Sequence, residues 1–127
     1  MRLALDTNRY RDLTDGVEEV VHRLSRVETI VVPFVVLAEL RGGFLVGRRG
    51  ERNERILQRF LAKPGVEVVY ADDGTTRAYA RLFRQLRKQG TPIPTNDLWI
   101  AALVSQHNMA LYSRDRHFDH LPQLIVV

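Results

Sequence analysis

LALDTN, at residues 3–8, is an apolar run that ends abruptly on an aspartate. Leu3, Ala4 and Leu5 predict a short strand buried on both faces, because brief apolar runs bounded by turn-forming residues are typical of such strands. A carboxylate at the end of this strand loses much of its water, which is costly without a positive partner. Asp6 therefore has two interpretations: it caps a following helical turn, or it lies at the ligand-binding edge of a parallel sheet.

Length and composition predict one ordinary globular domain over residues 1–127. The hydrophobic fraction of 45% and the charged fraction of 27% are both usual for such a domain. The sequence contains no cysteine, which excludes disulfides, thiol catalysis and cysteine-ligated zinc. No apolar run approaches the roughly 20 residues of a membrane span, and the N-terminus lacks a secretory apolar region. We expect a cytoplasmic location and no membrane partner.

Strand and helix patterns alternate along the whole chain, which predicts βαβ units. Five segments have the pattern of strands: 2–5, 29–33, 66–70, 110–113 and 124–127. Six segments have the pattern of helices or helical turns: 16–27, 34–47, 51–62, 72–90, 96–108 and 115–121. The expected fold is therefore a single α/β domain with a mainly parallel central sheet of about five strands and helices on both faces.

Four acids take positions in this layout that would bring them together. Asp6 and Asp115 each follow a predicted strand, and Asp97 opens a helix that Thr95 or Asn96 can cap. Glu39 lies within the apolar segment FVVLAELRGG, and a glutamate buried in such a helix rarely lacks a partner. Converging carboxylates repel each other unless a cation joins them. A divalent metal resolves this conflict, and oxygen ligands favour Mg²⁺, with Mn²⁺ as the alternative.

The segments LALDTN, VVLAELRGG, TNDLWIAA and LYSRDRHF resemble, in order and spacing, the four acidic motifs of PIN-domain ribonucleases. The likeness is greatest to the VapC-type toxins of bacterial toxin–antitoxin systems, and it extends over essentially the whole chain. It implies a catalytic and metal-binding quartet of Asp6, Glu39, Asp97 and Asp115. Thr7 and Ser113 match the small polar residues next to the first and last acids. Asp119, one helical turn beyond Asp115, is an alternative for the last acid.

The resemblance also implies a function. A bound metal lowers the pKa of a water molecule and stabilises charge on a phosphoryl group, so the expected activity is endonucleolytic hydrolysis of RNA that leaves a 3′-hydroxyl and a 5′-phosphate. The expected partners are a small VapB-type antitoxin and a second copy of the chain. The antitoxin is expected to lie along segment 34–47 and to direct a basic side chain towards the acids.

Basic and aromatic residues give weaker indications. The net charge of +4 and the pI of about 10.0 favour a polyanionic partner. Two stripes of basic residues each share a helical face, and either could contact RNA phosphates: Arg48, Arg52, Arg55 and Arg59 on one, Arg77, Arg81, Arg84 and Lys88 on the other. We expect Trp99 to belong to the core. The pair His117 and His120 has the spacing of zinc ligands but lacks a third ligand, so we expect a surface or capping role.

Three other classes of protein fit parts of the sequence. A receiver-like phosphoacceptor domain also gathers aspartates at a sheet edge, but it needs a lysine after a late strand, whereas Lys63 and Lys88 lie at predicted helix ends. A haloacid-dehalogenase-like phosphatase needs a second aspartate at the position of Asn8. A non-catalytic RNA-binding PIN-like module explains the charge and leaves the acids without a role.

Overall fold

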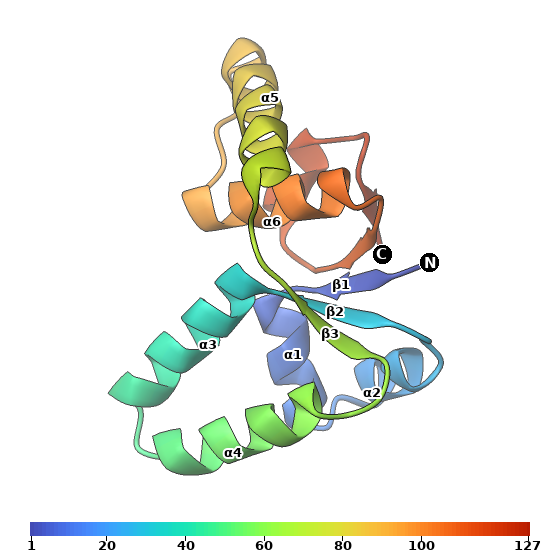
Figure 1. The fold of residues 1–127 in the computed structure, drawn as a ribbon, viewed down its shortest axis with the longest axis vertical. Coiled ribbons are helices and arrows are strands. Elements are labelled where there is room, and N and C mark those ends of the chain that lie inside the picture. Colours follow the sequence, from blue (N-terminus) through green and yellow to red (C-terminus); the bar gives the residue numbers. More distant parts are fainter.

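A computed structural model describes residues 1–127 as an α/β fold around one five-stranded sheet (Figure 1). The strands are β1 Leu3–Leu5, β2 Ile30–Pro33, β3 Val66–Val69, β4 Ala110–Tyr112 and β5 Ile125–Val126. The helices are α1 Thr7–Thr14, α2 Glu18–Ser25, α3 Phe34–Val46, α4 Gly50–Leu61, α5 Asp73–Gln89 and α6 Thr95–Gln106, with a 3₁₀ helix, η1, at Arg116–His120. None of the helices combines the length and the apolar character that a membrane crossing requires.

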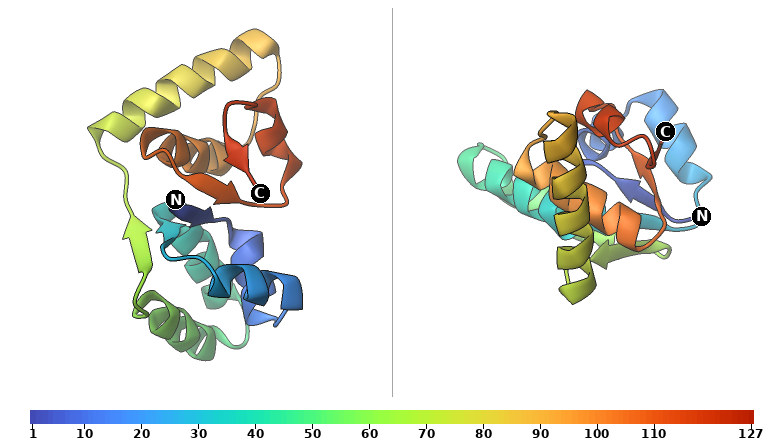
Figure 2. Two further views of the ribbon diagram at one scale, coloured as in Figure 1. Left: turned by 90° about the vertical axis from the view of Figure 1, so that its right-hand side faces the viewer. Right: turned by 90° about the horizontal axis from the view of Figure 1, so that it is seen from above.

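All neighbouring strands of the sheet are parallel, in the order β3-β2-β1-β4-β5, so the predicted sheet is confirmed. The helices α1 to α4 lie on one side of the sheet, and α5 and α6 lie on the other (Figures 1 and 2). The chain leaves β1 towards β2 but leaves β4 towards β5, in the opposite direction. Open parallel sheets bind ligands at such a switch point, at the carboxyl ends of the strands. The segments that follow β1 and β4 therefore form the expected binding edge.

The core surrounds the central strand. All three residues of β1 are buried, and α6 contributes a continuous buried run from Ile100 to Val104. A strand covered on both faces has no need of a polar alternation, which explains why β1 is apolar at every position. Burial of these side chains fixes the ends of β1 and α6 in space, and both ends carry an aspartate.

Two local predictions need correction. Residues after Asp6 form the full helix α1 rather than a single turn, and the Asp6 side chain accepts a hydrogen bond from the Thr7 backbone N–H. Both interpretations of Asp6 therefore hold, because it caps α1 and also ends a central strand. Helix α6 begins at Thr95 after Pro94 with no side-chain cap, so neither Thr95 nor Asn96 has the predicted capping role.

Candidate functional site

Asp6 lies buried at the carboxyl end of the central strand, with only 4% of its surface exposed. Its Oδ1 accepts the Thr7 N–H at 2.8 Å, and its Oδ2 accepts the Ser113 hydroxyl at 2.6 Å. The segments that follow the neighbouring strands β1 and β4 thus hold both carboxylate oxygens of Asp6 in place at the sheet edge.

Asp115 is tied to the same edge from the β4 side. Its backbone N–H donates to the Ser113 Oγ at 3.0 Å, and this hydroxyl in turn donates to Asp6. The Asp115 Oδ1 accepts the His117 backbone N–H at 2.9 Å and so caps η1. Ser113 therefore fixes the separation of the first and last acids. Asp119, the alternative to Asp115, is exposed and lies outside this cluster.

Asp97 enters the cluster from the first turn of α6. Its side chain is 14% exposed. The pKa of Asp97 is raised to about 6, chiefly by burial and also by the charges of Asp115 and Asp6, against the opposing effect of a hydrogen bond from His117. A carboxyl group with a raised pKa, next to two other acids, is typical of a cation-binding site.

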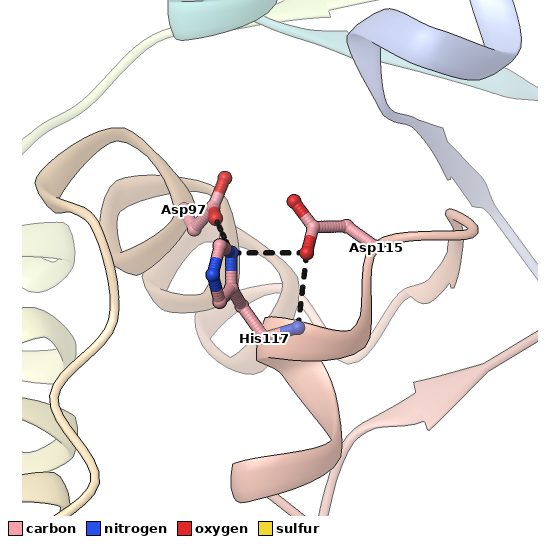
Figure 3. A group of neighbouring side chains, drawn as sticks. All are labelled: Asp97, Asp115 and His117. Atoms are coloured by element: carbon pink, nitrogen blue, oxygen red, sulfur yellow. Dashed lines mark hydrogen bonds and ion pairs between the residues drawn. The ribbon is translucent and has the colours of Figure 1, made fainter.

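His117, for which the sequence predicts a surface or capping role, is exposed as expected and is also a member of the site. Its Nδ1 lies 2.9 Å from Asp97 Oδ2 and 2.9 Å from Asp115 Oδ1 (Figure 3). The hydrogen bond to Asp97, followed by the charges of Asp115 and Asp97, raises the pKa of His117. His120 is exposed, as expected, and takes no part in the site. The relevant signal is the position two residues after Asp115, where a 3₁₀ turn directs the ring back to the strand end.

Glu39 differs from its prediction in burial but lies at the site. Although α3 is apolar, Glu39 is exposed, so the expectation of a buried glutamate is wrong. Its Oε1 accepts the Thr7 hydroxyl at 2.9 Å. The apolar neighbours Val35, Val36 and Leu40 face the core and leave Glu39 on the outer side of the helix. Thr7 thus links Glu39 to the helix start that Asp6 caps.

One continuous hydrogen-bond network connects all four acids. The links run from Glu39 through Thr7 to Asp6, then through Ser113 and Asp115 to His117 and Asp97. No arginine or lysine forms an ion pair with these acids. Arg9 and Arg114, which lie close to Asp6 and Asp115 in the sequence, both pair with Asp12. The site is therefore strongly acidic, and a histidine is the one basic group in contact with it.

The predicted basic stripes lie away from the acids. Arg48, Arg52 and Arg55 line a hollow at the turn from α3 to α4. Arg81 and Arg84 line a second hollow on α5. This hollow lies beside the C-terminal end of α6, whereas Asp97 lies at the N-terminal end of that helix. None of the four acids lines either hollow, so phosphate contact by these arginines stays a prediction. Trp99 is half-buried and packs against Phe34 and Tyr79 at the edge of the core.

The donor set fits a divalent cation. One oxygen of Asp97, one oxygen of Asp115 and one ring nitrogen of His117 all lie within 4.8 Å of one another. Ligands of a small cation with bonds of about 2.1 Å span comparable distances. Asp6 adds a buried carboxylate next to this group, so the residues present could hold Mg²⁺ or Mn²⁺.

Comparison with known proteins agrees with this geometry. The PIN domain family model matches residues 5–124. Ribonuclease VapC4 of Mycobacterium tuberculosis is 31% identical over 96 residues, which are 76% of this chain and 74% of that protein. This chain is a PIN domain of the VapC family. Ribonuclease VapC2 of Rickettsia felis is also 31% identical, over 81% of the PIN domain described here and 76% of its own length.

Solved structures show the same fold. VapBC2 from Rickettsia felis, crystallised with a DNA fragment from its promoter, superimposes on the PIN domain with a TM-score of 0.90 and 27% identity, over 100% of this chain and 98% of that one. VapBC-1 from nontypeable Haemophilus influenzae gives a TM-score of 0.89 and 27% identity, with 100% and 97% coverage. The family match excludes the receiver-like and phosphatase interpretations, and neither lysine lies at the acidic edge of the PIN domain.

We expect Mn²⁺ to stabilise the folded PIN domain. A cation that binds the assembled site and not the unfolded chain adds about 2.7 kcal/mol at 100 times its Kd, which corresponds to a rise in Tm of several degrees. Thermal unfolding of metal-free protein, with and without millimolar Mn²⁺, measures this effect. The Asp97→Asn variant should lose most of the rise, whereas Asp119→Asn, which changes an exposed acid outside the cluster, should keep it. Superimposable wild-type melting curves would contradict a cation site.

Proposed function

We propose that this chain is a metal-dependent endoribonuclease and the toxin of a VapBC-type toxin–antitoxin pair. The observation that carries the proposal is the cluster of Asp6, Asp97 and Asp115 at the switch point of the sheet, without an arginine or lysine partner. Relatives at about 31% identity are named ribonucleases. The family match and the unbalanced acids together favour a nuclease over a module that only binds RNA.

Each acid has a distinct part in this proposal. Asp6 and Asp97 would be the principal ligands of Mg²⁺ or Mn²⁺, and Asp115 would complete the site. The bound cation would supply an acidified water and charge stabilisation at the phosphoryl group. Ser113 and the Thr7 N–H hold Asp6 in place through its two oxygens. Ligands fixed in this way bind a cation with little reorganisation.

Glu39 would orient the attacking water rather than hold the cation. Its Oε1 is engaged by Thr7, and its side chain is exposed, in contrast to the buried Asp6. The free Oε2 can accept a proton from a water molecule between α3 and the strand ends. Arg48, Arg52, Arg55, Arg81 and Arg84 would guide the RNA backbone to the site over a longer range, since their hollows lie apart from the acids.

Two observations support an antitoxin partner: the assemblies of the structural relatives and an exposed apolar surface on α3. The structural relatives include VapBC toxin–antitoxin complexes. On this chain, the C-terminal part of α3 exposes Leu45 and Val46, which are 90% and 87% accessible. A small antitoxin helix would cover this apolar surface and direct a basic side chain towards Asp6 and Asp97. A toxin homodimer in the cytoplasm completes the proposal.

Expression in bacterial cells tests the toxin assignment. Induction of the chain alone should arrest growth and reduce intact RNA, and coexpression of the small protein encoded beside it should restore growth. Asp6→Asn should be harmless without the partner, while Asp119→Asn should arrest growth like the wild type. Growth arrest that persists in Asp6→Asn at equal expression would contradict nuclease toxicity.

A further inference from the structure

The ring of His117 is placed between two carboxylates of the site. Its Nδ1 lies 2.9 Å from Asp97 Oδ2, which comes from α6, and 2.9 Å from Asp115 Oδ1, which follows β4 (Figure 3). A single ring nitrogen carries at most one proton, so it cannot make two good hydrogen bonds to these oxygens at once. The ring nitrogen can therefore serve only one of the two oxygens as a hydrogen-bond donor, although it lies equally close to both.

The surrounding structure fixes the backbone that carries this half-exposed ring. Asp115 Oδ1 accepts the His117 backbone N–H at 2.9 Å, which locks the first turn of η1. The next residue, Phe118, is 1% exposed and anchors η1 in the core. The backbone of His117 thus has little freedom, and the ring points to the acids because of the turn.

The distances match those of neighbouring ligands around one cation. Two ligands that bind a small cation at about 2.1 Å and at right angles lie about 3 Å apart. Both separations from Nδ1 are 2.9 Å, and all three ligand atoms lie within 4.8 Å of one another. A neutral imidazole could therefore share a cation with both carboxylates after loss of its proton.

We propose that His117 is itself a metal ligand, so that this chain has a mixed carboxylate–imidazole centre that binds Mn²⁺ in preference to Mg²⁺. Mg²⁺ is bound mainly by oxygen and keeps several waters. Imidazole suits first-row transition metals instead. The inference rests on the proposed metal-dependent function and goes beyond it, because the acidic quartet alone is an all-oxygen site without this selectivity.

Calorimetric titration of metal-free protein with Mn²⁺ and Mg²⁺ measures the preference. Wild-type protein should bind Mn²⁺ at least about 10-fold more tightly than Mg²⁺, and His117→Ala should lose about 10-fold or more in Mn²⁺ affinity with a smaller change for Mg²⁺. His117→Asp restores an oxygen donor and should bring the two affinities close together. His120→Ala is the matched control, since His120 lies exposed on the same 3₁₀ helix. Equal losses of both metals in His117→Ala, or no loss of either, would overturn the inference.

Pulsed electron paramagnetic resonance of bound Mn²⁺ tests the bond directly. Wild-type and His120→Ala proteins should show coupling of the manganese electrons to a ¹⁴N nucleus, and His117→Ala should not. Bound Mn²⁺ without nitrogen coupling, in a protein that cleaves RNA, would overturn the inference and leave the proposed function intact. Nitrogen coupling in a protein that cleaves no RNA would support the inference and overturn the proposed function. Failure to bind either metal would overturn both.

Discussion

Asp6→Asn should reduce RNA cleavage by about 10³-fold or more, the largest effect that we expect from a single substitution, because it removes a buried charge at the centre of the proposed cation site. The protein should stay folded. Asparagine is as good an N-cap as aspartate, and its carbonyl oxygen can still accept the Thr7 N–H that Asp6 binds at 2.8 Å. We therefore expect a change in the free energy of unfolding of about 1 kcal/mol or less.

Initial rates of cleavage of a labelled RNA, measured next to urea unfolding curves, separate these effects. Asp119→Asn is the matched control, because it removes one exposed negative charge outside the cluster. Cleavage within a few fold of wild type in Asp6→Asn would mean that the site lies elsewhere. A large loss of stability would instead indicate that Asp6 serves mainly to cap α1.

Asp97→Asn should also abolish cleavage, and in addition it should stabilise the metal-free protein at alkaline pH. The pKa of Asp97 is about 6 in the folded chain, because of its burial and the charges of Asp115 and Asp6, against 3.8 for a free side chain. A raised pKa favours the folded state below pH 4, and this contribution is lost as the pH rises through 6. The shift corresponds to at most about 3 kcal/mol.

Protonation of His117 contributes to the pH dependence of stability with the same sign as Asp97. The pKa of His117 is raised by Asp97, so its protonation also favours the folded state at low pH. Wild-type protein should therefore lose stability between pH 5 and pH 8 relative to Asp97→Asn, and the variant should be more stable by about 1–2 kcal/mol at pH 8. Chelator-treated protein unfolded in urea at both pH values provides the measurement. Parallel pH profiles for the two proteins would contradict the proposed repulsion.

The parallel sheet and the convergence of three aspartates could be predicted from sequence because both follow from short-range patterns. Strands such as Leu3–Leu5 are apolar at every position and alternate with helices, which requires parallel pairing. Parallel strands then bring the residues that follow them to one edge. Asp6 and Asp115 lie together for this reason, although they are separated by most of the chain.

Other features depend on tertiary contacts that no local pattern reports. Helix α1 is polar and buries only Thr7 and Tyr10, so its sequence resembles a loop. The exposure of Glu39 depends on which face of the apolar helix α3 meets the core. The contact of His117 with Asp97 joins a 3₁₀ turn to the start of α6. Sequence spacing within RHFDH can suggest only the pairing with His120, which the fold does not use.

Cleavage of a purified single-stranded RNA under control of the metal tests the central claim most directly. Wild-type protein, freed of metal and mixed with a labelled oligomer, should be inactive in EDTA and should cut the RNA when excess Mn²⁺ or Mg²⁺ is restored, leaving a 5′-phosphate on the downstream fragment. Asp6→Asn prepared in parallel should give no product and so report any contaminating nuclease. Cleavage that continues in EDTA, or that Asp6→Asn performs at the wild-type rate, would contradict an acidic metal site as the centre of activity.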